Sequence, residues 1–469
     1  MAKAPLHVTS AMVPEDRVAE SKARLVEAGV EYCFAAWVDI HGRPKAKMVP
    51  IDLFGNLARG SEMYTVQAFD GMGQLGPQAP DQAVLPDLDT LTVCPWNHRY
   101  AWMTGDLYWK GEPYEYCSRT ILKNTIRQAA DKGFAMNLGI EPEFYILRPG
   151  QNGNRSEPFH AADKGPSWAY DVESTLDAMP LLDQLRRCLD ELEWEVGSFD
   201  HEGGHSQFEF DFTYTDVLQM CDRFALLRLL IKEVAKQHGA FATFMPKPFA
   251  NDFRSGAHFN MSLADATSGK NLMRDEADPR GIGFSQIAYQ FIAGLLDHAS
   301  AIAAVSAPTV NSYKGLIPSG VDPSGLIRDI SWAPVYVAYG DNNRALMLRL
   351  PHSRDCVENR VPDISMNPYW TAAIHLSAGI DGIERKLDPG PPQNANLYEM
   401  TPKQLAEAGV DLLPRTLAQA LVAFEKDPIT ERTFGPGPKN EYLALKTHEW
   451  EKYHAEISDW EWERYANFF

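Results

Sequence analysis

The chain has 469 residues, of which 45% are hydrophobic and 23% are charged, as is ordinary for a globular protein with a sizeable core. Its 44 basic and 63 acidic side chains give a formal charge of −19, which argues against nucleic acid or an anionic membrane surface as a partner. Six scattered cysteines without C-x-x-C spacing, and an N-terminus without an apolar signal core, predict a cytoplasmic protein.

The first part of the chain predicts a small domain built around a hairpin. A helix is expected over residues 14–28, where Gly29 ends it. Residues 31–39 and 43–50 have the composition of two strands, and a short turn joins them. We place the domain boundary near residue 115, which divides the chain into domains 1–115 and 116–469.

Beyond residue 115, helices alternate with pairs of strands. Helices are expected near 118–132, 175–194, 214–238, 282–303, 369–380 and 415–426, and strands near 134–147, 195–202, 206–212, 241–246, 257–263 and 345–350. Because the strands come in adjacent pairs that suit antiparallel pairing, we expect an α+β fold and not a doubly wound sheet. The apolar stretch 287–305 carries several polar residues and predicts a buried core helix, not a membrane span. Residues 151–168 and 315–331 are long Gly/Pro/Ser-rich segments that predict functional loops.

Glu141 and Glu143 lie one residue apart on the strand expected over 134–147. Side chains alternate along a strand, so these two carboxylates share a face, and they repel unless a cation or a proton lies between them. The same polar-x-polar spacing recurs in Gln207-Phe-Glu209, His258-Phe-Asn260 and Glu358-Asn-Arg360. The recurrence predicts a sheet whose inner face lines a metal-binding cavity.

The segment His201-Glu202-Gly203-Gly204-His205 matches the H-E-x-x-H pattern of zinc proteases. That pattern binds zinc only within a helix, where both imidazoles share a face. Two consecutive glycines break a helix, and strand-like sequences flank the motif. We therefore predict a strand–turn–strand unit that brings Glu202 and Glu209 to one site.

A hard, oxygen-rich set of side chains forms the candidate metal site: Glu141, Glu143, Glu202, Glu209, His258 and Glu358. Such ligands suit Mg²⁺ or Mn²⁺ better than Zn²⁺, and five carboxylates call for at least two divalent ions. Paired divalent ions suit phosphoryl transfer, and Arg344, Arg349 and Arg360 are close enough in sequence to hold a phosphoryl group. Taken singly, each glutamate is more often solvated or ion-paired, and His258 is more often a hydrogen-bonded core histidine.

Ordered motifs along nearly the whole chain resemble the glutamine synthetase family. The matching segments are Val38–Gly42, Phe69–Gly71, Gly139–Phe144, Gln207–Glu209, Phe244–Pro248, Ser255–His258, Ala307–Lys314, Asn343–Arg344, Glu358–Asp363 and Asn367–Tyr369. Within the family, Ile330–Pro334 and Ser458–Phe469 look like the γ-glutamylmethylamide synthetase branch, the glutamate–methylamine ligases. The resemblance implies an N-terminal β-grasp domain, a catalytic domain with an antiparallel sheet funnel, and a dodecamer of two hexameric rings with interfacial active sites.

The resemblance also implies roles for individual residues. Glu143, Glu202 and Glu209 would hold one ion and Glu141, His258 and Glu358 another, with two or three Mg²⁺ or Mn²⁺ ions per site. Arg344 and Arg360 would contact the γ-phosphate and the acid substrate, Arg349 the nucleotide phosphates, and Asn260 and Ser262 the nucleotide. Asp39 would face a neighbouring subunit's site and bind the incoming ammonium.

The implied reaction has two steps. ATP converts the γ-carboxylate of glutamate to an acyl phosphate, and a primary amine such as methylamine then attacks the carbonyl to give a γ-glutamyl amide. Methylammonium is protonated at neutral pH, so a carboxylate must bind it and help to remove its proton. Two alternatives remain open at this point: a glutamine synthetase that uses ammonia, and a non-catalytic scaffold or nitrogen sensor.

Three positions depart from the family pattern. Asn260 replaces a second histidine, Gly315 replaces an arginine that grips the α-carboxylate of glutamate, and Cys356 replaces an arginine two residues before Glu358. A lost charge-assisted hydrogen bond is worth about 1.5–3 kcal/mol, so we expect weaker anion binding in this pocket. We also expect the pocket to be enlarged at Gly315, which would admit a bulkier amine.

Two further family features are incomplete in this sequence. The flap glutamate that helps to deprotonate the amine has no clear counterpart in 315–331, where Asp322 and Asp329 are the acidic residues. Tyr398 resembles the tyrosine that some members adenylylate, although an ordinary loop tyrosine fits this position equally well.

Overall fold

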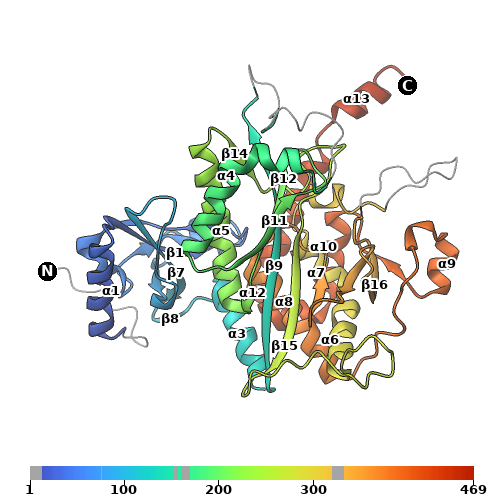
Figure 1. Ribbon diagram of the computed structural model, residues 1–469, viewed down its shortest axis with the longest axis horizontal. Helices are drawn as coiled ribbons and strands as arrows, with labels where there is room; N and C mark the ends of the chain where they lie inside the picture. The colour runs from blue at the N-terminus through green and yellow to red at the C-terminus, as the bar shows by residue number, and fades with distance from the viewer. Residues whose placement is uncertain (1–12, 75, 151–156, 160–168, 319–331) are drawn as a thin grey trace.

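The computed structural model describes residues 13–74, 76–150, 157–159, 169–318 and 332–469. It contains two sheets, one in the N-terminal part and a larger one in the remainder of the chain (Figure 1). Most of the loops predicted at 151–168 and 315–331 lies outside the described residues, and so do both Asp322 and Asp329.

The N-terminal part holds an eight-stranded sheet among the described residues, in the order β2-β1-β7-β5-β4, with β3 paired to β1 and with β6 and β8 paired to β7. Helix α1 (Glu15–Glu27) and the short α2 (Phe54–Leu57) accompany these strands: β1 (Tyr32–Val38), β2 (Pro44–Lys45), β3 (Met48–Pro50), β4 (Met63–Tyr64), β5 (Gln82–Pro86), β6 (Thr92–Val93), β7 (Tyr100–Trp109) and β8 (Glu112–Pro113). The predicted hairpin is confirmed, since β1 pairs antiparallel with both β2 and β3.

The tip of this hairpin packs against the larger part of the molecule. Gly42 has a φ of 73°, and a Cβ built there would lie 2.9 Å from both Arg228 Nη2 and Asn367 Cα. Glycine is therefore required twice over, by the backbone conformation and by the close approach. The contact fixes the position of the hairpin relative to the catalytic part.

The larger sheet has eleven strands among the described residues, in the order β11-β12-β9-β15-β18-β17-β16-β19, with β10, β13 and β14 also paired to β9. The strands are β9 (Phe134–Arg148), β10 (Glu157–Pro158), β11 (Val196–His201), β12 (Gln207–Phe212), β13 (Thr215–Asp216), β14 (Phe241–Thr243), β15 (Ala257–Asp265), β16 (Tyr336–Asp341), β17 (Leu346–Leu350), β18 (Val357–Asn359) and β19 (Asp411–Leu412). All pairs are antiparallel except β16 with β17. The predicted α+β class with an antiparallel catalytic sheet is confirmed.

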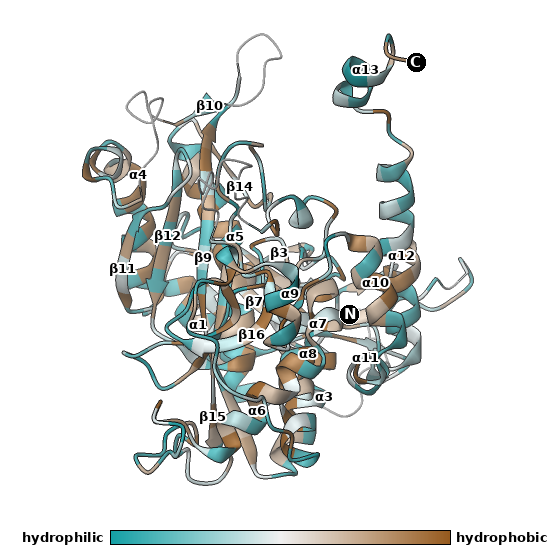
Figure 2. Ribbon diagram, turned by 90° about the vertical axis from the view of Figure 1, so that its right-hand side faces the viewer, coloured by the Kyte–Doolittle hydropathy of each residue, from teal (hydrophilic) through white to brown (hydrophobic). Residues whose placement is uncertain are grey.

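Helices pack beside this sheet and carry most of the apolar core. They are α3 (Ser118–Ala130), α4 (Val172–Glu191), α5 (Val217–Gln237), α6 (Gln286–Asp297), α7 (Ala299–Ser306), α8 (Pro368–Glu384), α9 (Pro402–Glu407), α10 (Leu417–Lys426), α11 (Pro428–Phe434), α12 (Pro436–His454) and α13 (Asp459–Tyr465). Helix α8 is buried along almost its whole length and contacts α3, α5, α6 and α11. Helix α13 stands apart from the rest of the molecule (Figures 1 and 2).

The single helix predicted over 282–303 is wrong. The chain breaks at His298 into α6 and α7, which meet at 74°. The ring of His298 bonds to Asp427 at 2.9 Å and to Asp381 at 3.2 Å, so distant residues hold the break. Both helices are largely buried, as predicted. Within the described residues no one helix meets the length and hydropathy of a membrane span, and α6 with α7 meets them only as a bent pair.

Candidate active site

The strand registers of the larger sheet bring the polar-x-polar pairs together. Glu143 of β9 lies opposite Glu209 of β12, and Glu209 lies opposite Asp200 of β11. Two residues earlier on β9, Glu141 lies opposite His258 of β15. Directly opposed residues of antiparallel strands point to one face, with Cβ atoms about 4.5–5.5 Å apart. Side chains far apart in the sequence therefore form one polar surface.

The same surface continues from β15 across two more strands. Asn260 of β15 lies opposite Glu358 of β18, which lies opposite Arg349 of β17. Acidic groups thus occupy β11, β12 and β9, while arginine begins at β17. The face changes from acidic to basic across the sheet.

The two glutamates of β9 meet different neighbours, and Pro142 lies between them. Proline has no N–H to donate to a strand ladder. The pairing of β9 with β15 ends at Pro142, and the pairing with β12 begins at Glu143. Glu141 and Glu143 share a face, but one is opposed by an imidazole and the other by a carboxylate.

The turn between β11 and β12 has the predicted strand–turn–strand form. Strand β11 ends at His201 and β12 begins at Gln207, so the H-E-x-x-H segment is not helical. A Cβ at Gly204 would lie 2.0 Å from the Tyr145 hydroxyl, so the turn has no room for a side chain there. Glu202, at the start of the turn, lines the same cavity as Glu209.

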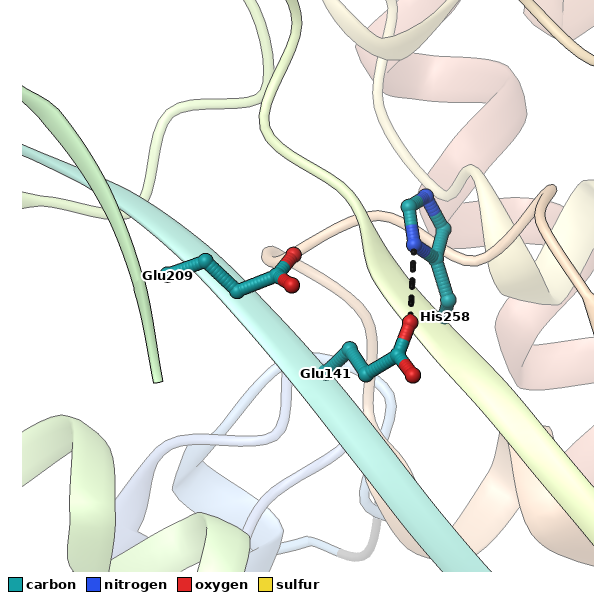
Figure 3. Close-up of side chains that lie close together, drawn as sticks. All are labelled: Glu141, Glu209 and His258. Atoms are coloured by element: carbon teal, nitrogen blue, oxygen red, sulfur yellow. Dashed lines mark ion pairs between the residues drawn. The ribbon is translucent and has the colours of Figure 1, made fainter. Parts of the chain in front are cut away.

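Two groups of side chains hold their ligand atoms within 4.8 Å of one another: Glu141, Glu209 and His258, and Glu143, Glu202 and Glu209. Figure 3 shows the first group, in which the three side chains, from β9, β12 and β15, point into one space. His258 joins the two groups, since its Nδ1 lies 3.5 Å from Glu141 Oε2 and its Nε2 lies 3.5 Å from Glu143 Oε1. Glu209 belongs to both groups.

The pKa values show how strongly these carboxylates repel one another. Burial and then the charges of Glu143 and Asp200 raise the pKa of Glu202 to about 8. Burial and repulsion by Glu141, Glu143 and Glu202 hold the pKa of Glu209 far above its usual range. Burial also acts to raise the pKa of Glu141, but the hydrogen bonds and charges of His258 and Arg354 outweigh it and lower that pKa.

Glu358 is fully buried and is bound by two arginines. Arg349 Nη1 donates to its Oε2 at 2.6 Å, and Arg360 Nη1 donates to its Oε1 at 2.9 Å. Its Oε1 lies 4.0 Å from His258 Nδ1, which places it at the edge of the Glu141 group. Arg344 lines the same cavity, where burial and then the charges of Arg349 and Arg360 lower its pKa.

Except for the fully buried Glu358, these groups line a cavity of about 850 Å³. An adjoining cavity of about 770 Å³ holds Asn260 and Ser262, the two residues expected near a nucleotide, and shares Glu141 and Arg354 with the first. The two adjoining cavities therefore form one long site over the sheet. The carboxylates and the imidazole that could bind metal lie between its two ends.

Among the charged residues that line these cavities, the sequence did not single out Asp200, Asp211, Arg254, Arg354 and Asp355. Asp200 and Asp211 follow the same spacing, two residues from Glu202 and from Glu209, so the pattern could have found them. Burial and then Asp211 and Glu143 raise the pKa of Asp200 to about 6. The two arginines lie outside any repeated spacing.

These two arginines change the expectation drawn from Gly315 and Cys356. Arg354 donates to Glu141 Oε1 and lies 3.8 Å from Glu358 Oε2, close to the position that Cys356 leaves without a charge. A Cβ at Gly315 would lie 2.6 Å from Arg254 Cβ, so the side chain of Arg254 occupies the space beside Gly315. Among the described residues, five arginines line the cavity: Arg254, Arg344, Arg349, Arg354 and Arg360.

Asp39 does not reach the cavity of its own chain. Its carboxylate accepts from the backbone N–H groups of His41 at 3.0 Å and Arg43 at 2.8 Å, and it lies 3.3 Å from Lys45 Nζ. These bonds hold the hairpin turn. Tyr398 is likewise engaged, because its hydroxyl donates to Ala333 O at 2.6 Å, and burial raises its pKa.

The donor set fits a hard divalent cation. Oxygen ligands dominate, and the raised pKa values of Glu202 and Glu209 show carboxylates that lack a neutralising charge. A zinc-type site would offer cysteine or more imidazole, and among the described side chains of this cavity His258 is the one imidazole and no thiol is present.

Comparison with known proteins identifies the family of this chain. The family model described as "Glutamine synthetase, catalytic domain" matches residues 115–465. The chain is 38% identical to the glutamate–methylamine ligase of Methyloversatilis universalis, over 96% of this chain and 99% of that protein. It is 34% identical to the glutamine synthetase of Clostridium saccharobutylicum, over 94% of this chain and 96% of that protein.

Solved structures give the same result. A GmaS/ADP complex matches with a TM-score of 0.86 and 29% identity, covering 95% of this chain and 99% of that chain. Ligand-free GmaS matches with a TM-score of 0.84 and 30% identity, at the same coverage. The resemblance seen in the sequence is confirmed: the chain belongs to the glutamine synthetase family.

Proposed function

We propose that this chain is an ATP-dependent acid–amine ligase that joins glutamate to methylamine or another primary amine through an acyl phosphate. The observation that carries the proposal is the pair of carboxylate groups sharing Glu209, set against arginines in one cavity. Such a site can bind divalent ions and an anionic substrate together. The likeness to a glutamate–methylamine ligase supports this choice of substrates.

The site residues divide the work between them in this proposal. Glu143, Glu202 and Glu209, and Glu141, His258 and Glu358, would hold two or three Mg²⁺ or Mn²⁺ ions, which when bound neutralise charge on phosphate oxygens. Arg344 and Arg360 would orient the transferred phosphoryl group and the acid, and Arg349 the nucleotide phosphates. Asn260 and Ser262, in the adjoining cavity, would contact the nucleotide.

The amine requires a group that binds a cation and removes a proton. In the proposal Asp39 supplies it to a neighbouring subunit, because within its own chain Asp39 stays on the hairpin and away from the cavity. This requires an oligomer with interfacial sites, which we propose to be a dodecamer of two hexameric rings. Residue 115 would divide the N-terminal domain from the catalytic domain, and the enzyme would act in the cytoplasm.

Phosphate release with acids crossed against amines tests the function. We expect release of phosphate from ATP that requires both glutamate and a primary amine, with the γ-glutamyl amide identified by mass spectrometry. Phosphate release of the same rate without any amine would contradict the proposal. Saturating metal chelator is the matched control and should abolish release.

The ammonia-using alternative is separated from the proposal by kinetics. The chain is similar to glutamine synthetases as well, at 34% identity in one case. A kcat/KM for methylamine above that for ammonia selects the methylamine ligase, and the reverse order selects a glutamine synthetase. The scaffold alternative is disfavoured by the crowded carboxylates, since burying them without a cation is destabilising.

A further inference from the structure

Arg254 is a partly buried cation that pairs with no carboxylate among the described residues. Its Nη2 donates to Val361 O at 2.9 Å and its Nη1 to Arg360 O at 3.3 Å, so both terminal nitrogens bond to neutral backbone carbonyls. Its Nε has no hydrogen-bond partner among the described atoms. Burial lowers its pKa, partly offset by the more distant charges of Asp363 and Glu143. A guanidinium that is desolvated and bonded only to neutral groups favours binding of an anion.

The side chain of Arg254 fills the space beside Gly315. A Cβ built on Gly315 would meet Arg254 Cβ at 2.6 Å and Cδ at 3.1 Å. The two segments are tied together nearby, because Lys247 N donates to Asn311 Oδ1 at 2.7 Å and Asn311 Nδ2 donates to Lys247 O at 3.0 Å. The family pattern has an arginine at position 315. In this chain the cation of the same region is Arg254, which belongs to another segment.

Arg254 lies at the end of the site away from the adjoining cavity. Gln207 Nε2 donates both to Arg254 O at 2.9 Å and to Glu143 Oε2 at 3.1 Å, which sets Arg254 beside the Glu143 group. Arg254 lines the larger cavity but not the adjoining one, whereas Arg354 lines both. An anion held by Arg254 is therefore separated from the nucleotide end.

We propose that Arg254 binds one carboxylate of the acid substrate, the one that is not phosphorylated. Arg254 thereby takes the role of the family arginine that Gly315 replaces. The proposal rests on the proposed function and names its specificity-determining residue. An acid with two carboxylates needs one held while the other reacts, and a guanidinium binds a carboxylate with charge-assisted hydrogen bonds. The substrate class is a dicarboxylic amino acid of glutamate's length.

Arg228 provides a matched control. It is also partly buried, and its Nη1 bonds to the backbone carbonyls of Ile364 and Met366 at 3.3 Å, in the segment that follows the one held by Arg254. Its Nη2 donates to Gly42 O on the hairpin. It does not line the cavity. Replacing either arginine by glutamine removes the charge and keeps one amide that can donate to a carbonyl.

The kinetic test compares Arg254→Gln with Arg228→Gln. A lost charge-assisted bond of about 1.5–3 kcal/mol corresponds to a rise in KM for glutamate of roughly tenfold to hundredfold in Arg254→Gln. We expect KM for ATP and for the amine to stay within about twofold in Arg254→Gln, and Arg228→Gln to leave KM for glutamate and for ATP unchanged. An unchanged KM for glutamate, an equal rise in KM for ATP, or an equal effect of Arg228→Gln would overturn the proposal.

A charge-swapped variant and a binding measurement complete the test. Arg254→Gly combined with Gly315→Arg moves the cation to position 315 and should recover most of the affinity for glutamate; no recovery in a folded protein would count against the proposal. The rise in Tm on addition of glutamate is measured for the same proteins, because it reports binding without requiring turnover. If the wild type formed no amide, the proposed function would fail, yet a glutamate-dependent rise in Tm confined to proteins with Arg254 would still support this inference.

Discussion

Two buried clusters of carboxylates in this molecule have opposite designs. The Arg119 cluster, between the N-terminal and catalytic parts, joins Arg119 to Asp222 at 2.9 Å, to Asp87 at 2.8 Å and to Asp106 at 3.2 Å. The Tyr369 hydroxyl also donates to Asp222, at 2.7 Å. The larger cavity of the candidate active site, called the Glu209 cavity below, also contains several carboxylates. In it, Glu202 and Glu209 face other acidic side chains.

The pKa values show the difference at Asp87 and Glu202, although burial raises the pKa of Asp222 despite its bonds to Arg119. Burial acts to raise the pKa of Asp87, and the charge and hydrogen bonds of Arg119 outweigh it and lower that pKa. In the Glu209 cavity burial and neighbouring carboxylates act together, and the pKa of Glu202 rises to about 8. Carboxylates that the chain itself neutralises serve the fold, whereas carboxylates left to repel one another require a cation from outside. The predictions below test this contrast.

The largest expected effect is on activity in Glu209→Gln. Glu209 belongs to both ligand groups, so its loss should weaken both and reduce kcat by on the order of a thousandfold. The metal-free variant should nevertheless be at least as stable as the wild type, because a neutral amide relieves the repulsion. Activity and the Tm in chelator are the measurements; a large fall in the metal-free Tm would contradict the contrast.

The opposite result is expected at the other cluster. Arg119→Met should destabilise the protein by about 3–5 kcal/mol, because removing one partner of a buried ion pair leaves uncompensated charge. Chemical denaturation in chelator measures this free energy of unfolding. Lys123→Met is the control, since Lys123 contacts Asp106 from a more exposed position and should cost less than about 1 kcal/mol. Equal effects of the two substitutions would remove the distinction.

The two clusters should also differ in their response to pH and metal. In the metal-free protein Glu202 stays protonated between its ordinary value of 4.5 and about 8, so folding takes up a proton in this range and stability falls as pH rises through it. A divalent ion replaces that proton. The rise in Tm caused by Mg²⁺ should therefore be larger near pH 8.5 than near pH 6, and Glu202→Gln should flatten the difference. A rise in Tm independent of pH would argue against the raised pKa.

Arg354 should have a smaller effect, confined to the nucleotide. Its guanidinium bonds to Glu141 and lines both cavities. When a cation binds Glu141, Arg354 becomes free to contact a phosphate. Arg354→Gln should raise KM for ATP about tenfold and leave KM for glutamate within about twofold. A selective rise in KM for glutamate would instead assign Arg354 to the acid.

The smallest effect is expected at His298, where a titratable cation neutralises the carboxylates. Burial acts to lower the pKa of His298, but hydrogen bonds to Asp427 and Asp381 and the charges of Asp427 and Asp297 outweigh it and raise that pKa. Arg385 and Arg432 also bind Asp381, so this cluster has its own positive charge. The stability from His298 should be complete below pH 6.5 and be lost as pH rises through the raised value. His298→Gln should cost about 1–2 kcal/mol at pH 6 and less at pH 9, as measured by denaturation.

Local sequence predicted the parts of the site that depend on strand periodicity. Glu141 and Glu143 share a face because the strand period is two, and that inference needs no long-range information. Glu141 faces His258 and Glu143 faces Glu209 because of the register between strands that lie more than 60 residues apart in the sequence. Gln207 and Glu143, for example, are 64 residues apart. The family resemblance supplied that pairing before the structure did.

Other features could not be obtained from local sequence. Arg254 and Arg354 belong to no repeated spacing, and their approach to Gly315 and Glu141 depends on how loops fold over the sheet. The break at His298 depends on Asp427, which is 129 residues away. Tertiary contacts overrode the local preference of an apolar stretch for one long helix.

Binding of Mn²⁺ to the metal-free protein tests the central claim most directly. Electron paramagnetic resonance of free Mn²⁺ during titration gives the number of ions bound per chain. We expect at least two in the wild type and a clear loss of affinity in Glu209→Gln, with Arg119→Lys binding like the wild type. If the wild type bound no Mn²⁺, or if Glu209→Gln bound it as tightly, the carboxylates of this cavity would not be the cation site described here.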